Sequence, residues 1–196
     1  MTDRTRRASP LSVEDRRAMI VDAVIPLLIE HGRGVTSRQI AESAGIAEGT
    51  IFRAFGDKES LVQAAIEKYL DPGELTAGLK SIDAGLPLEA KIRLIIELMQ
   101  RRFEYVMGFM AALGEIRRPP VKNPPMQFVE LITEVLRPDL DRLNVPPVQV
   151  AQYIRLVAFA STITEFNRGF ELDAETITSL IMNGIAGHAS AAVIEP

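Results

Sequence analysis

The sequence predicts an all-α fold, and three of its features support this prediction. Apolar residues recur with the 3.6-residue spacing of amphipathic helices along most of the 196 residues. Alternating β-branched runs closed by Asn-Gly or Asp-Gly, the pattern of strands and hairpins, do not occur in the sequence. Prolines and glycines divide the apolar pattern into segments of ordinary helix length. We therefore expect several short helices near the N-terminus, followed by a larger helical domain.

The composition excludes several classes of protein. With 47% hydrophobic and 24% charged residues, the chain is typical of a folded globular protein. It has no cysteine, which excludes disulfides, thiolate nucleophiles and cysteine metal sites and fits a reducing compartment. The N-terminus lacks the apolar region of a signal peptide, and no apolar run reaches the roughly 18 residues of a membrane span. We expect a cytoplasmic protein with no membrane segment, no metal and no cofactor.

The first helix is expected to follow a flexible basic arm. Residues 1–11 are polar and include Arg4 and Arg6, and we expect them to form this arm. Ser12 is suited to cap the helix that follows, because its hydroxyl can accept a hydrogen bond from a free backbone N–H group. The helix should run to about Glu30, and the sequence His31-Gly32-Arg33-Gly34 should stop it, since glycine adopts the left-handed conformation found after many helices.

Three short helices are expected next. Thr36 or Ser37 is suited to cap the first of them, which ends before Gly45. The second spans residues 47–52, and an aspartate caps the third over residues 57–70.

The sequence Asp71-Pro72-Gly73 interrupts the helical pattern and is the expected domain boundary. Longer helices follow it, so the second domain is expected to be larger than the first. The predicted parts are the arm at 1–11, a helix-turn-helix domain at 12–58, a connecting helix at 59–71 and a helical domain at 72–196. Within the last domain, helices are expected at residues 74–81, 87–113, 126–136, 147–167 and 174–192.

The most informative stretch is residues 35–61, where apolar side chains are placed to hold two short helices together. Ile40 and Ala41 fall on one face of the first helix, and Gly45 permits the tight turn that follows it. Ile51 supplies an apolar contact from the second helix. This pattern is the helix-turn-helix, in which the second helix enters the major groove of DNA while the first crosses the backbone.

This stretch resembles the DNA-binding signature of the TetR family of bacterial regulators. The resemblance covers about the first third of the chain. It consists of motifs in a fixed order, namely a glycine turn, a threonine cap, an Ile-Ala pair, an Ala-Gly-Ile turn, a short recognition helix, an aromatic pair and Lys-x-x-Leu. These are Gly34, Thr36, Ile40-Ala41, Ala44-Gly45-Ile46, Ala47–Phe52, Phe52 with Phe55, and Lys58–Leu61. The resemblance implies an operator-binding transcriptional regulator with a C-terminal domain for ligand binding and dimerisation.

The resemblance and side-chain chemistry together assign the DNA-facing positions. Thr36 and Ser37 begin a helix whose free N–H groups and hydroxyls suit a phosphate, and a simple N-cap explains them equally well. Arg38 has the planar fork that suits guanine, and the alternative is a solvated surface arginine. Glu48 can accept from the cytosine amino group or only complement the helix dipole. The full predicted set is Thr36, Ser37, Arg38, Ala47, Glu48, Gly49, Thr50, Phe52, Arg53 and Lys58.

The overall charge is unusual for a DNA-binding protein. The 22 lysines and arginines against 26 aspartates and glutamates give a net charge of -4, whereas a strongly basic domain is the usual footprint. Residues 1–60 contain nine basic and nine acidic side chains. DNA binding must therefore depend on where the charges lie. Phe52 and Ala54 also stand where many TetR-family members carry tyrosine or histidine, which removes donors to phosphate.

The resemblance implies a small-molecule site in the helical domain. The helix expected at residues 87–113 has more apolar circumference than packing against one neighbour requires, and methionine with phenylalanine gives an adaptable wall. The alternative is that these side chains belong to an ordinary core. We expect a medium-sized, largely apolar effector with a few hydrogen-bonding groups. The predicted ligand-binding residues are Met99, Arg102, Phe103, Met107, Met110, Phe128, Tyr153, Phe159, Thr162 and Phe166.

The last two predicted helices are rich in small and aliphatic residues, which permit close helix packing. By resemblance they form a four-helix interface in a homodimer, and symmetry then places the recognition helices about 34–36 Å apart, one turn of duplex. The alternative is that they only close the core of one protomer. The predicted interface residues are Ala158, Ile177, Leu180, Ile181, Gly184 and Ile185.

We expect no enzymatic activity. The chain has two histidines, no cysteine and no glycine-rich phosphate loop after a strand. The prediction is a repressor that a small-molecule effector releases from its operator, because an effector with different affinity for two states shifts their populations. The alternative is a helical small-molecule-binding or interaction protein that does not bind an operator.

Overall fold

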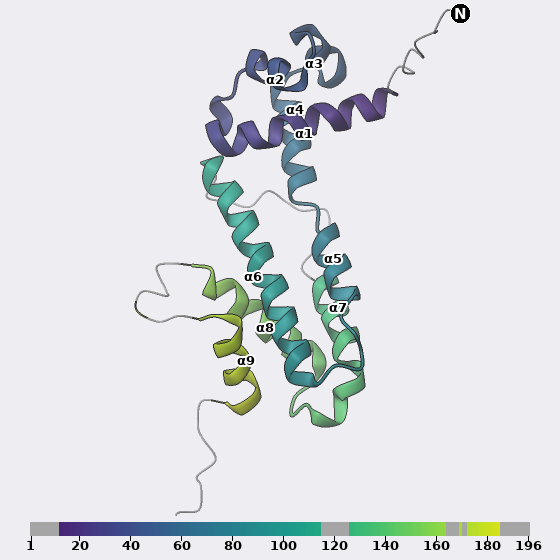
Figure 1. Cartoon of the computed structure of the whole chain (residues 1–196), viewed down its shortest axis with the longest axis vertical. Helices are drawn as coiled ribbons and strands as arrows, with labels where there is room; N and C mark the ends of the chain where they lie inside the picture. Colours follow the sequence, from purple (N-terminus) through teal and green to yellow (C-terminus); the bar gives the residue numbers. More distant parts are fainter. Residues whose placement is uncertain (1–11, 115–125, 164–168, 170–171, 185–196) are drawn as a thin grey trace, which may run out of the picture. The chain divides into compact units, whose positions relative to one another are not determined.

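The computed structural model describes residues 12–114, 126–163, 169 and 172–184. Every regular element in these ranges is helical (Figure 1), which confirms the predicted all-α fold. The α-helices are α1 (Val13–His31), α2 (Ser37–Ala44), α3 (Glu48–Phe55), α4 (Lys58–Tyr69), α5 (Gly73–Lys80), α6 (Leu88–Ala112), α7 (Met126–Leu136), α8 (Pro147–Ser161) and α9 (Ala174–Asn183). Two 3₁₀ helices, η1 (Gly32–Gly34) and η2 (Arg137–Arg142), complete the described elements.

The described residues fall into two compact units. One unit contains those within Met1–Asp71 and Gly108–Val121, and the other contains those within Pro72–Met107 and Lys122–Pro196. The end of α6 therefore belongs to the first unit, whereas the predicted scheme assigned everything after residue 71 to one domain. The sequence could not predict this division, because apolar periodicity identifies a helix but does not show that its two ends have different neighbours.

The first unit is built on the inner faces of α1 to α4. α1 begins at the predicted cap, since the Ser12 hydroxyl accepts a hydrogen bond from the amide of Asp15 at 3.0 Å. It then packs against α2, α3 and α4. The fully buried side chains that fill the space between these helices are Ile20, Val24, Leu28, Val35, Ile40, Ile51, Leu61 and Ala65.

A close backbone approach fixes the end of α1. Gly32 has a φ of +57°, and a Cβ atom at this position would lie 2.6 Å from the carbonyl oxygen of Ala112. Both the conformation and the contact therefore require glycine. In the same unit the ring of Tyr69 stacks on that of Phe109, with centroids 3.8 Å apart.

The second unit has its own apolar core, to which α5, α6, α7, α8 and α9 all contribute. Its centre contains Ile92, Ile95 and Ile96 of α6, with Ile132 of α7 and Ile154 of α8 around them. All five side chains have almost no exposed surface. At about 25 cal/mol per Å² of buried apolar area, such residues are the main source of this unit's stability.

A buried ion pair joins α6 to η2 within the second unit. Lys91 is 1% exposed, and its Nζ atom lies 2.8 Å from Oδ2 of Asp139. Arg142 is a second cation at the same carboxylate, with Nη1 3.4 Å from Oδ1. The ion pair with Asp139 offsets the free-energy cost of removing the Lys91 ammonium from water. The same carboxylate is also paired with Arg142.

Three predicted helix ends were wrong. α3 starts at Glu48 with Ala47 as its N-cap and continues to Phe55, beyond the predicted residue 52. α8 ends at Ser161, because the hydroxyls of Ser161 and Thr162 each donate to the backbone carbonyl three residues earlier. α9 ends before Gly184, whose φ of +73° closes it. Residues 164–168 and 185–192, which the predicted helices included, lie outside the described residues.

Candidate nucleic-acid interface and ligand site

A capping box fixes the start of α2. The Thr36 hydroxyl accepts from the amide of Gln39 at 3.2 Å, while the Gln39 side chain accepts from the amide of Thr36 at 2.8 Å. Thr36 is therefore used as a cap, the simpler of the two roles that the sequence left open. Both residues are polar at the spacing that this motif requires, and they set the direction in which α2 leaves η1.

The turn between α2 and α3 has the geometry of a helix-turn-helix. Gly45 is left-handed, with φ and ψ of 64° and 35°, and the amide of Ile46 donates to the carbonyl of Ala41 at 3.0 Å. α3 follows after two residues, and its buried side chains are Ile51 and Phe55. These contacts hold α2 and α3 side by side, as Figure 1 shows.

Most of the predicted DNA-facing residues are exposed positions of α2, of α3 or of the turn between them. Arg38, Ala47, Glu48, Gly49 and Arg53 are exposed. Thr36 and Phe52 are also exposed, the latter with 46% of its surface accessible, whereas Ser37, Thr50 and Lys58 are half-buried. A phenylalanine this exposed on α3 is a candidate for contact with a partner molecule.

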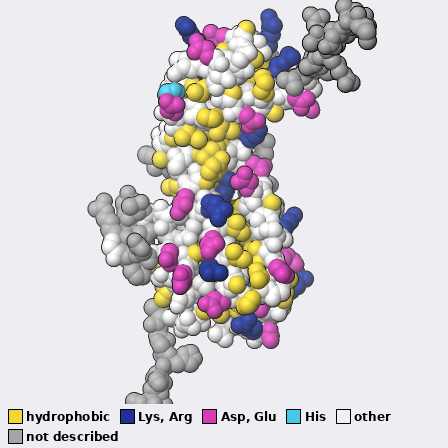
Figure 2. Space-filling model, in the orientation of Figure 1, with side chains coloured by type: hydrophobic (Ala, Val, Ile, Leu, Met, Phe, Trp, Pro, Cys, Tyr) yellow, Lys and Arg dark blue, Asp and Glu magenta, His cyan; other side chains and the backbone are white. Residues whose placement is uncertain are grey.

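Charges of both signs lie on this surface. Arg38 Nε donates to Oε1 of Glu42 at 2.9 Å, and both side chains are largely exposed. This hydrogen bond and the charge of the Glu42 carboxylate raise the pKa of the Arg38 guanidinium, and Glu48 contributes in the same direction. Figure 2 shows basic and acidic side chains interspersed over α2 and α3, as expected from the neutral balance of the first 60 residues.

Lys58 has contacts that the sequence did not predict. Its Nζ atom donates to the carbonyl oxygens of Arg33 and Val35, each at 3.0 Å. Lys58 therefore ties the start of α4 to the segment that leads into α2. Its predicted phosphate contact remains a prediction, because an ammonium group has a third N–H donor.

Arg17 is a positioning residue that sequence analysis missed. It donates to the carbonyl oxygen of Ala54, and its guanidinium lies over the ring of Phe55, 4.2 Å from the centroid. Both contacts hold the C-terminal end of α3 against α1. An exposed arginine on a first helix carries no sequence signal for this role, since its partners are 37 residues away.

The structure separates the predicted ligand-binding residues. Phe103 and Phe159 make an edge-to-face contact with centroids 5.2 Å apart, and Met99 is buried in the core of the second unit. Met110 belongs instead to the first unit, so it is not part of that core. Tyr153 lines a cavity that the remaining predicted residues do not line. Met107 is exposed, Arg102, Phe128 and Thr162 are half-buried, and Phe166 lies outside the described residues.

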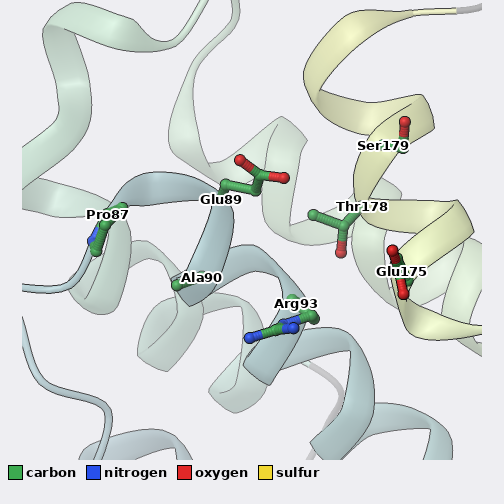
Figure 3. Close-up of a pocket in the computed structure, with 7 residues that line it drawn as sticks. All are labelled: Pro87, Glu89, Ala90, Arg93, Glu175, Thr178 and Ser179. Carbon is green, nitrogen blue, oxygen red and sulfur yellow. The ribbon is translucent and has the colours of Figure 1, made fainter.

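Two hollows in the second unit lie between α6 and α9. The first, of about 440 Å³, is an open groove that contains no predicted ligand residue. Figure 3 shows Glu89 and Arg93 on one side of it and Glu175 and Thr178 on the other. The second, of about 230 Å³, also reaches α8 and the segment after η2, and its lining is mainly apolar.

The predicted dimer-interface residues divide into two groups. Ala158 and Ile177 are completely buried in the core of the second unit, so a partner subunit has no access to their side chains. Leu180 and Gly184 are exposed, and Ile181 is half-buried. Ile185 lies outside the described residues. The small and aliphatic pattern of the sequence thus includes core positions as well as surface positions.

Within the described residues, there is no group of three or more histidine, aspartate or glutamate side chains placed to hold a metal ion. The helices described are too short or too polar to cross a membrane.

Comparison with known proteins identifies the first unit by sequence. Residues 20–65 match the family described as bacterial regulatory proteins, tetR family. The uncharacterized HTH-type transcriptional regulator YvkB of Bacillus subtilis is 43% identical over 51 residues, which are 26% of this chain and 27% of that protein. The chain matches between 27% and 29% of the length of the curated relatives. These relatives are described as transcriptional regulators and not as enzymes.

Solved structures match over nearly their whole length and show the fold. A TetR/AcrR-family transcriptional regulator from Thermobifida fusca has a TM-score of 0.61 at 18% identity, with 88% of this chain and 99% of that chain covered. The regulator FadR of Bacillus subtilis, solved in complex with stearoyl-CoA, has a TM-score of 0.56 at 16% identity and covers 86% of this chain and 99% of its own. The architecture of a helix-turn-helix domain followed by a helical domain is therefore confirmed.

Proposed function

Because this chain belongs through its N-terminal domain to the tetR family of bacterial regulatory proteins, we propose that it binds double-stranded operator DNA and regulates transcription. The observation that carries the proposal is the exposed outer face of α3. Ala47, Glu48 and Gly49 begin this helix without a side-chain cap, and Phe52 and Arg53 follow on the exposed surface. Small residues at the start of a recognition helix allow close approach to the floor of the major groove.

The proposed regulator is a homodimer that acts in the cytoplasm. Val148, Leu156 and Phe159 of α8 are large apolar side chains that remain exposed. At 3.6 residues per turn, these three positions lie on one side of that helix. Exposed apolar side chains grouped in this way favour a protein contact, and a two-fold axis would present two α3 helices to successive major grooves.

We propose repression that a small molecule relieves. An effector releases the operator only if it binds more tightly to the state that does not fit DNA. Small-molecule binding has a precedent in this fold, since FadR, which resembles this chain in fold, was solved in complex with stearoyl-CoA.

Gly49 offers a test that separates DNA contact from folding. A Cβ atom at Gly49 would meet nothing within 4 Å, so Gly49→Gln should fold normally. Its side chain would nevertheless occupy the space through which α3 approaches the groove. We expect binding to promoter DNA from the gene's own neighbourhood, measured by fluorescence anisotropy, to weaken at least tenfold, with an unchanged melting temperature.

Gly108→Gln is the matched control, because position 108 is also exposed and also open around its Cβ position. This variant should bind DNA like the wild type. Equal affinities of Gly49→Gln and the wild type would show that α3 does not enter the groove. Sedimentation velocity across a range of protein concentrations tests the dimer, and a purely monomeric species would contradict the half-site spacing.

A further inference from the structure

The cavity of about 230 Å³ in the second unit has mostly apolar lining residues and a single charged side chain. Leu88 and Ile92 of α6 and Val150 of α8 are buried residues that line it, and Ile181 of α9 is a half-buried one. Arg142 is the one charged side chain among the described residues of the lining. No carboxylate belongs to this lining, so a bound anion would meet no like charge there.

The charges behind the cavity wall leave Arg142 with a surplus positive charge. Asp139 carries one negative charge and has two cationic neighbours, Lys91 at 2.8 Å and Arg142 at 3.4 Å. The shorter contact is with Lys91, whose ammonium group is almost completely desolvated. The negative charge of Asp139 therefore mainly offsets the desolvation cost of Lys91. The cluster of three therefore carries a net charge of +1, and Arg142 is the member that lines the cavity.

The side chain of Arg142 is also available for a ligand. It is 50% exposed, and a guanidinium has five N–H donors, of which Asp139 accepts from one. Asn144, Gln149 and Tyr153 line the same cavity and supply further neutral hydrogen-bonding groups. A carboxylate has two oxygens and is the group that a planar guanidinium binds best.

The volume limits the size of the ligand. Pockets for drug-sized molecules measure about 300–1,000 Å³, so a cavity of about 230 Å³ fits a smaller molecule. We propose that this cavity binds a small amphipathic monocarboxylate, with its hydrocarbon chain against Leu88, Ile92 and Val150 and its carboxylate on Arg142. Binding itself does not depend on the proposed function, whereas any effect of the ligand on operator affinity rests on it.

Octanoate is a suitable probe, and isothermal titration calorimetry on the full chain measures its binding directly. We expect saturable binding with one site per chain. Octan-1-ol, which lacks the charge, should bind at least tenfold more weakly, and octyltrimethylammonium, which has the opposite charge, should not bind measurably. No saturable binding of octanoate would overturn the proposal.

Arg142→Gln should weaken octanoate binding at least tenfold, and Arg142→Lys should retain part of the affinity. Arg137→Gln is the matched control, because Arg137 lies in the same 3₁₀ helix but pairs with Glu134 and does not line the cavity. Ile181→Trp should fill the cavity and abolish binding in a protein whose melting temperature shows that it is folded. Equal affinities of Arg142→Gln and the wild type would refute the assignment, as would equal losses in the two glutamine variants.

Three more outcomes distinguish this ligand site from a dimer contact and from the proposed function. If a second copy of the chain fills the cavity, octanoate affinity will fall as protein concentration rises, and the proposal is then wrong. Octanoate that binds through Arg142 to a protein with no operator affinity would support the site and refute the proposed function. DNA binding without octanoate binding would support the proposed function and refute the site.

Discussion

Single residues in the first unit have roles that depend on a few short contacts. Arg17 holds the end of α3, Thr36 caps α2, and Gly32 lets the backbone of α1 meet Ala112. Of these residues, Thr36 and Gly32 were predictable, because caps and left-handed glycines have local signatures. Arg17 was not, because its contacts come from a helix distant in sequence.

Gly32→Ala should destabilise the first unit by about 1–3 kcal/mol, because a Cβ atom would meet the Ala112 carbonyl and the φ would be strained. Urea denaturation followed by circular dichroism measures the change. Gly34→Ala is the control, since a Cβ atom at Gly34 has open space and no positive φ opposes it. Equal stabilities of the two variants would contradict the close approach.

Glu42→Gln should strengthen binding to all DNA sequences by about threefold, because it removes a negative charge beside phosphates. It should also reduce the preference for the base that we propose Arg38 contacts, since glutamine would hold Arg38 by a neutral hydrogen bond and no longer by an ion pair. Competition between operators with single base changes measures both effects. Unchanged preference would show that Glu42 does not orient Arg38.

At the scale of helices, the sequence predicted starts better than ends. Ser12, Thr36, Asp57 and Asp173 each accept a hydrogen bond from the amide three residues later, so four of the described helices begin with a side-chain cap. The end of α8 was predicted too late, since residues 162–168 contain no glycine or proline that would mark it in the sequence. The sequence did not predict η2, because its residues lack the regular apolar spacing by which a helix is identified.

The aspartate caps predict a loss of stability in acid. The amide of Ser60 lowers the pKa of Asp57, and the amide of Thr176 lowers the pKa of Asp173, mainly by hydrogen bonds to the ionised form. A carboxyl group with a lowered folded pKa stabilises the protein above its unfolded pKa of about 3.9. That contribution is lost as the pH falls below this value towards the folded pKa.

The double variant Asp57→Asn, Asp173→Asn should have a melting temperature that depends less on pH between pH 5 and pH 2. Asparagine still caps a helix, so the melting temperature at pH 7 should fall by only a few degrees. Calorimetry at several pH values measures the slope. A slope as steep as that of the wild type would mean that other carboxylates dominate.

At the scale of the whole molecule, two units with separate cores hold the two candidate sites. The sequence could predict the helix-turn-helix, because its motif is local, and the DNA-facing residues assigned to it stay predictions. It could not predict where a cavity lies. Apolar residues on α6 alternate between core and surface, and one sequence does not show which positions border a hollow. Arg142, which lines the cavity, lies in the unpredicted 3₁₀ helix.

Lys91→Met should destabilise the second unit by about 3–5 kcal/mol, because it leaves the buried Asp139 with only the longer contact to Arg142. The double variant Lys91→Met, Asp139→Leu should recover much of that loss, since no buried charge remains unpaired. Urea denaturation measures both, with the two units free to unfold in separate transitions. A single variant as stable as the wild type would contradict the role of the pair.

The two carbonyl contacts of Lys58 change how an alanine scan of this surface must be interpreted. Truncation at position 58 releases the chain that enters α2, so affinity for an operator can fall even if no phosphate lies within reach of the ammonium group. Ionic strength separates the two causes. If truncation at position 58 removes a phosphate contact, DNA binding releases one counterion fewer, and the slope of log affinity against log salt concentration becomes shallower by about one. If truncation only displaces α2, this slope stays the same.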